Sequence, residues 1–240
     1  MVAVRYLGTG EAFDEKRPNM SFILETKTQR LLFDCGYSIP HQLWSVSTAP
    51  DYLDGIYISH FHADHCFGLP ALVARLGQDG RRAPLRIVGG PGSQVAATNV
   101  LEMGYPGILK KTPFSLDFIE IEPGAERSFG GWVMSTARSY HSRPNYSVRV
   151  TADGFVVCYS GDGAPSTSCR QLYQRADLLI HEAYYPNATG KRSHASLGEV
   201  LTLASDVAAQ QLHLVHLSRK VARPTDLVIP EAGEHFLLSR

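Results

Sequence analysis

The sequence predicts a protein of the α/β (α+β) class in which two β layers are covered by helices. With 240 residues and 44% hydrophobic content, the chain can bury a full core, and we expect one domain over residues 1–240. About eleven short apolar segments have strand character, which is too many for one open sheet. Helical patterns lie between them, and helices on the outer faces of two sheets would bury their apolar stripes.

The expected strands are short runs rich in β-branched and aromatic residues. They fall at residues 2–7, 21–25, 30–33, 53–59, 85–88, 118–121, 132–136, 146–150, 155–160, 178–180 and 212–215. No internal repeat or low-complexity linker interrupts this series.

Helices are expected at residues 69–76, 93–103, 167–175 and 196–209. The last of them has the strongest pattern, because Ser196 and Glu199 have the spacing of a capping box. Its apolar stripe consists of Leu197, Val200, Leu201, Ala204, Val207 and Ala208.

Composition indicates which partners and which cell compartment to expect. The 23 basic and 23 acidic side chains cancel, so the chain as a whole lacks the basic surplus of a protein that wraps polyanions. Its four cysteines are widely spaced and form no Cys-x-x-Cys motif. The start of the chain does not resemble a signal peptide, and no apolar run has membrane-spanning length. We therefore expect a cytoplasmic protein with reduced thiols and no membrane partner.

The densest chemical motif is His60-Phe61-His62-Ala63-Asp64-His65, directly after the expected strand at residues 53–59. Imidazole and carboxylate groups are the ligands of zinc and similar first-row metals. The alternation of His60 and His62 lets a strand end direct two imidazoles at one ion, and Asp64 and His65 can serve a second ion. A polar loop with surface histidines is the alternative, but it does not explain this density.

Further ligands are needed to complete a two-metal site. His141, Asp162 and His216 each follow an apolar strand-like segment, as the first motif does. Taken singly, Asp162 has the setting of a turn between two glycines, and His216 that of a buried core histidine. Together with the first motif, they provide the chemistry of a binuclear site.

The sequence resembles the metallo-β-lactamase superfamily of metallohydrolases along its whole length, through the order of these seven residues. Within it, the chain is most similar to the tRNase Z branch of nucleases and phosphodiesterases. Segments that carry this similarity are residues 6–12, 32–36, 67–70, 160–162, 180–183 and 194–196. The resemblance implies a four-layer αββα sandwich with a binuclear centre at one edge between its sheets.

The resemblance also assigns ligands. It implies that His60, His62 and His141 bind one divalent ion, that Asp64, His65 and His216 bind the other, and that Asp162 bridges them. Zinc is the expected metal, with manganese or iron as alternatives, because all three accept nitrogen and oxygen ligands. Two such ions lower the pKa of bound water, so a hydroxide held between them would be the nucleophile.

For catalysis, the resemblance implies roles for Asp64, Glu182 and His194. His194 would give a proton to the leaving group, and Glu182 would orient His194. Asp34 resembles a carboxylate that orients a metal ligand or bound water. Each has a simpler alternative, since His194 has the setting of an exposed loop residue, Glu182 that of a surface charge and Asp34 that of a turn cap.

The substrate prediction depends on a short connection. The tRNA-maturing enzymes of this branch carry a long arm between the strand that follows the equivalent of His141 and the strand that precedes the equivalent of Asp162. In this chain, only residues 151–154 join the two corresponding strands. Asp153-Gly154 is a tight hairpin signal. We therefore expect a hydrolase of small phosphodiesters, cyclic nucleotides or short nucleic acids, with no obligate protein partner. Dimers are common in the family it resembles, so a homodimer is compatible with this expectation.

Other functions remain open at this level. A tRNA 3′-end endonuclease, or a hydrolase of lactones, thioesters or β-lactams, would use the same ligands. A di-iron redox protein is disfavoured, because that branch typically has a carboxylate at the position of His62. A binding module without catalysis is disfavoured by the complete set of seven ligand candidates.

Overall fold

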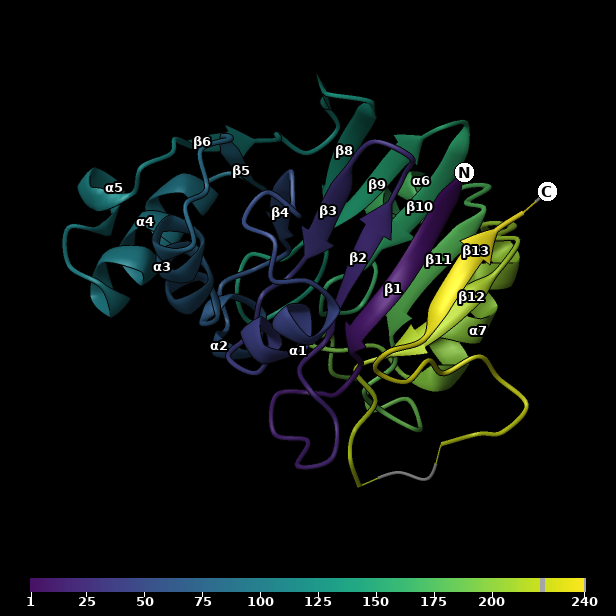
Figure 1. Ribbon diagram of the computed structural model, residues 1–240. Coiled ribbons are helices and arrows are strands. Elements are labelled where there is room, and N and C mark those ends of the chain that lie inside the picture. The colour runs from purple at the N-terminus through teal and green to yellow at the C-terminus, as the bar shows by residue number, and fades with distance from the viewer. Residues whose placement is uncertain (221–222, 240) are drawn as a thin grey trace.

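Two mixed β-sheets lie face to face, and helices cover both outer surfaces (Figure 1). The structure is a computed structural model that describes residues 1–220 and 223–239. The two ends of the described chain lie close together, because β1 (Val2–Gly8) pairs with β13 (His235–Leu238) in antiparallel register. This arrangement is the αββα sandwich that the sequence predicts.

The first sheet has seven strands in the order β13-β1-β2-β3-β4-β5-β6. The strands not yet introduced are β2 (Ser21–Glu25), β3 (Arg30–Phe33), β4 (Gly55–Ile58), β5 (Leu85–Gly89) and β6 (Leu116–Glu120). Strands β3 to β6 run parallel to one another. Their carboxyl ends therefore lie at one edge of the sheet, where β4 delivers the first histidine motif.

The second sheet has six strands in the order β12-β11-β10-β9-β8-β7. They are β7 (Glu126–Phe129), β8 (Trp132–Arg138), β9 (Tyr146–Ala152), β10 (Phe155–Tyr159), β11 (Leu178–Glu182) and β12 (Leu212–Val215). Strands β9 and β10 are joined by the two residues Asp153 and Gly154, both with positive φ. This is the tight hairpin that the Asp-Gly signal predicts.

Alternation along the strands builds the core. On β1, Val2, Val4 and Tyr6 belong to the cluster between the sheets, whereas Leu7 packs under the outer helices. Strand β9 contributes Val148 and Val150 to the central cluster in the same way. Because side chains alternate between the two faces of a strand, each sheet is apolar on both sides and requires a helical layer outside it.

The helices divide between the two outer surfaces. The first sheet is covered by α1 (Ile39–Val46), α3 (Leu69–Gln78), α4 (Ser93–Gly104) and α5 (Ile108–Lys111), and the second by α6 (Thr167–Leu172) and α7 (Leu197–Asp206). A one-turn helix, α2 (Ala63–Cys66), lies in the first histidine motif. No helix of the described ranges has both the length and the apolarity needed to cross a bilayer.

Several predicted boundaries are wrong, for identifiable reasons. The described residues form thirteen strands, and the two that the sequence analysis missed, β7 and β13, are edge strands with largely exposed side chains. The predicted helix 196–209 ends at Asp206, because Ala208 adopts φ 51°. The predicted helix 167–175 ends at Leu172, and Arg175 has φ 54°. Left-handed residues end helices, and glycine is the usual signal for them.

Stability should depend on pH through His213, a buried residue remote from the predicted ligands. Its Nδ1 lies 2.8 Å from the Tyr6 hydroxyl, and burial lowers the pKa of His213 to about 4. The unfolded chain protonates this imidazole near pH 6.5, so the folded state binds fewer protons and loses stability as the pH falls. Between pH 7.5 and 5, we expect His213 to contribute a loss of about 2 kcal/mol in the free energy of unfolding.

The matched variant is His213→Asn, which keeps an acceptor for Tyr6 but does not titrate. Guanidinium unfolding of the metal-loaded protein at both pH values should show a smaller pH-dependent loss in this variant. Equal losses in wild type and variant would contradict the assignment.

Candidate metal centre

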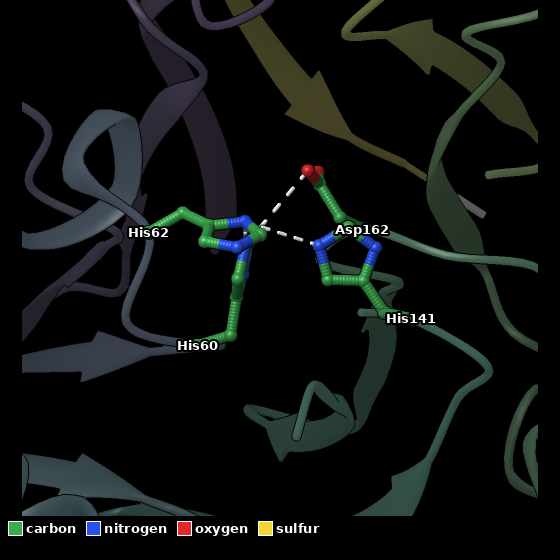
Figure 2. Close-up of side chains that lie close together, drawn as sticks. All are labelled: His60, His62, His141 and Asp162. Carbon is green, nitrogen blue, oxygen red and sulfur yellow. Dashed lines mark hydrogen bonds and ion pairs between the residues drawn. The ribbon is translucent and has the colours of Figure 1, made fainter. Parts of the chain in front are cut away.

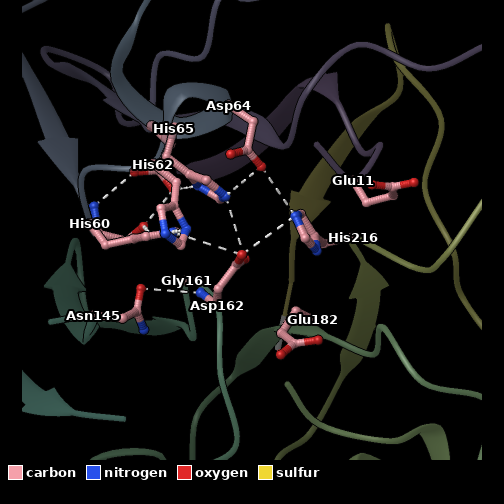
Figure 3. A network of polar contacts seen from close by, with 12 residues as sticks. Glu11, His60, His62, Asp64, His65, Asn145, Gly161, Asp162, Glu182 and His216 are labelled. Carbon is pink, nitrogen blue, oxygen red and sulfur yellow. Dashed lines mark hydrogen bonds and ion pairs between the residues drawn. The ribbon is translucent and has the colours of Figure 1, made fainter. Parts of the chain in front are cut away.

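All seven predicted ligands lie at one edge of the sandwich, although they come from five different segments. His60 and His62 follow β4, Asp64 and His65 lie on α2, His141 follows β8, Asp162 follows β10, and His216 follows β12. The polar side chains converge from both sheets (Figure 3). The structure therefore brings together every residue that the sequence analysis named as a ligand.

The first group contains His60, His62, His141 and Asp162 (Figure 2). The Nε2 atom of His60 lies 3.0 Å from His62 Nδ1, and that of His141 lies 3.1 Å from the same atom. The Asp162 Oδ2 atom lies 3.8 Å from His60 Nε2. Ligands around a tetrahedral zinc are about 3.3 Å apart, so this spacing fits one metal ion.

The second group contains Asp64, His65, His216 and again Asp162 (Figure 3). The Asp64 Oδ2 atom lies 3.2 Å from His65 Nε2 and 3.4 Å from His216 Nε2. The Asp162 carboxylate lies 3.5 Å from each of these two nitrogens. Asp162 is thus the member shared by both groups.

Two buried polar atoms of the cluster lack hydrogen-bond partners within the described chain, which is expected of metal ligands. The buried atoms His65 Nε2 and Asp162 Oδ1 have no hydrogen-bond partner among the described residues, although they lie 3.5 Å apart. Buried polar atoms are rarely unpaired, and nitrogen and carboxylate oxygen at this spacing are the donor set of a divalent cation. The fold and this cluster indicate that the protein binds divalent metal.

Outer partners fix which imidazole nitrogen faces the cluster. The His65 Nδ1 atom donates to Asp34 Oδ2 at 2.7 Å, and His141 Nδ1 donates to the Ser193 carbonyl at 2.6 Å. Asp34 is fully buried and also accepts from Tyr159 and from Ser59. These bonds leave the Nε2 lone pairs of His65 and His141 free for a metal.

Two side chains, Asn145 and Ser139, hold the backbone at Asp162. Asp162 N donates to Asn145 Oδ1 at 3.1 Å, and its carbonyl accepts from Ser139 at 2.8 Å. Gly161 has φ 58°, and a Cβ there would lie 2.3 Å from Asn145 Oδ1. The glycine is therefore required both by the left-handed backbone and by the close approach of Asn145.

Electrostatics differ between the two groups. Burial lowers the pKa of His60, His62 and His141, which keeps these imidazoles neutral and able to donate lone pairs. Burial also opposes the charging of His216, but Asp162 and Asp64 outweigh it and raise the pKa of His216 to about 9. In the second group, the acidic side chains attract cations, and metal ions would take the place of protons there.

Glu182 and His194 form a third group beside the metal ligands. The His194 Nδ1 atom donates to Glu182 Oε1 at 3.2 Å, and the His194 ring lies 5.0 Å from that of His141. Burial would raise the pKa of Glu182, but the hydrogen bond from His194 outweighs it and lowers that pKa. Glu182 is fully buried, which excludes the alternative of a surface charge. Because the hydrogen bond to Glu182 uses His194 Nδ1, the Nε2 atom of His194 remains free for a substrate.

A cavity of about 350 Å³ opens over the cluster, and we call it the catalytic cavity. Its lining includes Glu11, Phe13, Tyr37, His62, Asp64, His141, Asp162, Tyr184, His194 and His216. A larger cavity of about 680 Å³ lies beside Tyr105 and Lys111 on the helical surface, and none of the grouped His, Asp and Glu residues lines it. The chemistry of the side chains identifies the smaller cavity as the candidate active site.

Some features of the site could not be read from the sequence. Asn145 and Tyr159 had no motif that set them apart, because their partners are distant in the chain. The start of α3, at Gly68, packs against the carbonyl groups of Cys35 and Gly36 and does not line the catalytic cavity. Arg219 forms an ion pair with Glu11, which lines the catalytic cavity.

The fold and the cluster define the class. Two facing sheets with outer helices and a shared His/Asp site are the architecture of the metallo-β-lactamase superfamily, and the chain is a tRNase Z-like protein of that superfamily. Residues 2–228 match the family model described as Anti-Pycsar protein Apyc1, and the chain belongs to this family.

Relatives and solved structures agree with this placement. Ribonuclease Z of Methanosarcina mazei is 27% identical over 284 aligned positions that cover 96% of this chain and 91% of the relative. Ribonuclease Z of Methanothermobacter thermautotrophicus is also 27% identical, with 98% and 92% covered. Human tRNase Z, short form, superimposes with a TM-score of 0.83 at 24% identity, covering 99% of this chain and 100% of that one. The metallo-β-lactamase fold protein YhfI of Bacillus subtilis gives 0.80 at 22% identity, with 98% of both chains covered.

Proposed function

We propose that this protein is a metal-dependent phosphodiesterase. The observation that supports this most directly is the Glu182–His194 pair, which lies beside the metal cluster and holds His194 Nε2 free. An alkoxide leaving group needs a proton when a phosphodiester bond breaks, and an oriented histidine can provide it near neutral pH. The relatives named Ribonuclease Z are, by that name, nucleases and therefore support phosphodiester cleavage.

Each group has a distinct role in this proposal. His60, His62 and His141 would hold one ion, Asp64, His65 and His216 would hold the other, and Asp162 belongs to both groups. Bound divalent ions would supply a hydroxide nucleophile at neutral pH and offset the charge of the phosphate. Asp34 fixes the orientation of His65, and Glu182 fixes that of His194. His194 then gives its proton to the oxygen that leaves.

Two substrate classes have different support. The names of the relatives favour an RNA endonuclease that acts at tRNA 3′ ends, and they support it more directly than the small phosphodiesters that the sequence analysis put first. A specific observation favours small substrates, namely the hairpin of Asp153 and Gly154 between β9 and β10, which leaves no arm there. The alignment to the M. mazei relative spans 284 positions although this chain has 240 residues, so the relative carries insertions.

The test is a comparison of substrates with the zinc- or manganese-loaded protein. We expect turnover of bis(p-nitrophenyl) phosphate together with either cyclic nucleotides or a tRNA precursor with a 3′ extension. A higher kcat/KM on the precursor would select the RNA class, and a higher value on cyclic nucleotides would select small substrates. Background rates on all phosphodiesters, with turnover of a lactone, thioester or β-lactam, would overturn the proposal.

A further inference from the structure

A second cavity, of about 200 Å³, is lined partly by residues that directly adjoin lining residues of the catalytic cavity along the chain, at 61/62 and 142/143. It is lined by Phe61, residues 90–93, Arg143 and Tyr146, and we call it the Ser93 cavity. His60 also belongs to its lining, while the Nε2 atom of His60 faces the metal cluster. His60 therefore lies between the Ser93 cavity and the metal cluster.

Three side chains of the Ser93 cavity have hydrogen-bond donors that lack a partner among the described residues. Ser93 is 5% exposed and Tyr146 is 9% exposed, yet neither hydroxyl makes a hydrogen bond within the described ranges. The guanidinium of Arg143 pairs with no described carboxylate. None of the three groups is a fully buried unpaired donor, so they are open to water or to a polar ligand in the cavity.

The charges around the Ser93 cavity favour an anion. None of the described residues that line it is acidic, and Arg143 adds a positive charge. Helix α4 begins there after Gly92, with no side-chain cap and no acidic residue in its first turn. Its positive dipole end therefore lies at the cavity. Glu120 accepts one amide of this turn, from Gln94 at 2.9 Å, but does not line the cavity.

The size of the Ser93 cavity fits a phosphoryl group. A volume of about 200 Å³ equals the share of roughly seven water molecules in the liquid. Gly90 allows the Tyr146 ring to form one wall of the cavity, because a Cβ at this position would lie 2.2 Å from Cδ2 of Tyr146. The tyrosine ring can pack directly on the backbone only at a glycine.

We propose that the Ser93 cavity binds a second phosphate of the substrate, next to the phosphodiester that is cleaved at the metal cluster. This inference rests on the proposed phosphodiesterase function and deepens it. Arg143, Ser93 and Tyr146 donate to the oxygens of that phosphate. The substrate class is then a phosphodiester that carries a further phosphate, such as an oligonucleotide or a terminally phosphorylated dinucleotide.

Kinetics test the role in substrate choice. The substrates are the dinucleotide uridylyl-uridine and the same dinucleotide with an added phosphate at its 5′ or its 3′ end. For the wild-type protein, we expect one phosphorylated form to have a kcat/KM about tenfold higher, mainly through KM. In Arg143→Gln and in Ser93→Ala, this ratio should fall to between one and about threefold.

The matched control is Arg82→Gln, since Arg82 is an exposed arginine that lines the larger cavity on the helical surface. It should keep the wild-type ratio. A wild-type ratio near one for both phosphorylated forms, or a ratio unchanged in Arg143→Gln, would overturn the second-phosphate role while leaving the phosphodiesterase proposal intact.

Direct binding tests the cavity without activity. Crystals of the metal-free protein are soaked in selenate, and the anomalous selenium signal is located. We expect a peak between Arg143 and Ser93 in wild type, and no peak there in Arg143→Gln. Absence of the peak in wild type overturns the site even if the enzyme is active. A peak without any effect on the kinetic ratio would identify an adventitious anion site only and would also overturn the proposal.

Discussion

Replacing Asp162 with asparagine should lower hydrolysis by at least about 10³-fold and should reduce the bound metal below the wild-type content. The Asp162 carboxylate belongs to both ligand groups and lies 3.5 Å from both His65 Nε2 and His216 Nε2. An amide has nearly the same shape but no charge, so the backbone contact with Asn145 is kept while the attraction for two cations is lost. Metal analysis by mass spectrometry and turnover of bis(p-nitrophenyl) phosphate provide the measurement.

The control for this substitution is Asp153→Asn. Asp153 lies in the exposed β9–β10 turn at φ 47°, a conformation that asparagine tolerates. This variant should keep both metal content and turnover. If Asp162→Asn retained its metal and lost less than about threefold in rate, the assignment of Asp162 to both ions would be wrong.

Replacing His194 with alanine should separate substrates by their leaving groups. For a cyclic nucleotide or RNA, whose alkoxide needs a proton, we expect a loss of about 10²- to 10⁴-fold in kcat. For bis(p-nitrophenyl) phosphate, the leaving p-nitrophenolate is stable as an anion, so the loss should be much smaller. The physical basis is the bond from His194 Nδ1 to Glu182 Oε1, which orients the free Nε2 atom.

His235→Ala serves as the control, since His235 is an exposed histidine on the edge strand β13. It should leave the rates on both substrates unchanged. Metal content of His194→Ala should equal that of wild type, which separates proton transfer from metal binding. Equal losses on both phosphodiesters would show that His194 acts in binding or structure rather than as a proton donor.

The layered fold could be predicted because most of its strands have a recognisable pattern of apolar residues. Strands such as β1 and β9 carry apolar side chains on both faces. That pattern can be recognised in the sequence without knowing the order of the strands in the sheet. The sequence does not predict β7 and β13, because an edge strand with exposed side chains has no such pattern. Helix ends were misplaced where Ala208 and Arg175 adopt a left-handed backbone that glycine usually signals.

The seven candidate ligands could be named from the sequence because few side-chain types can bind a metal ion. His60 to His65 form a dense motif, and His141, Asp162 and His216 each follow a strand. The residues that hydrogen-bond to these candidate ligands are harder to identify. Asp34 could be named only through the family resemblance, and Tyr159, which donates to Asp34 across 125 positions of the chain, has no signal in its own segment.

The sequence by itself determined the two-sheet architecture and the identity of the seven residues that gather at its edge, since periodicity and ligand chemistry are local properties of the chain. Only the tertiary structure decided which imidazole nitrogen faces the cluster and that Ser93, Arg143 and Tyr146 meet in a cavity beside His60. The physical reason is that hydrogen bonds and cavities form between strand ends brought together by packing, and the spacing of residues along the chain does not encode those distances.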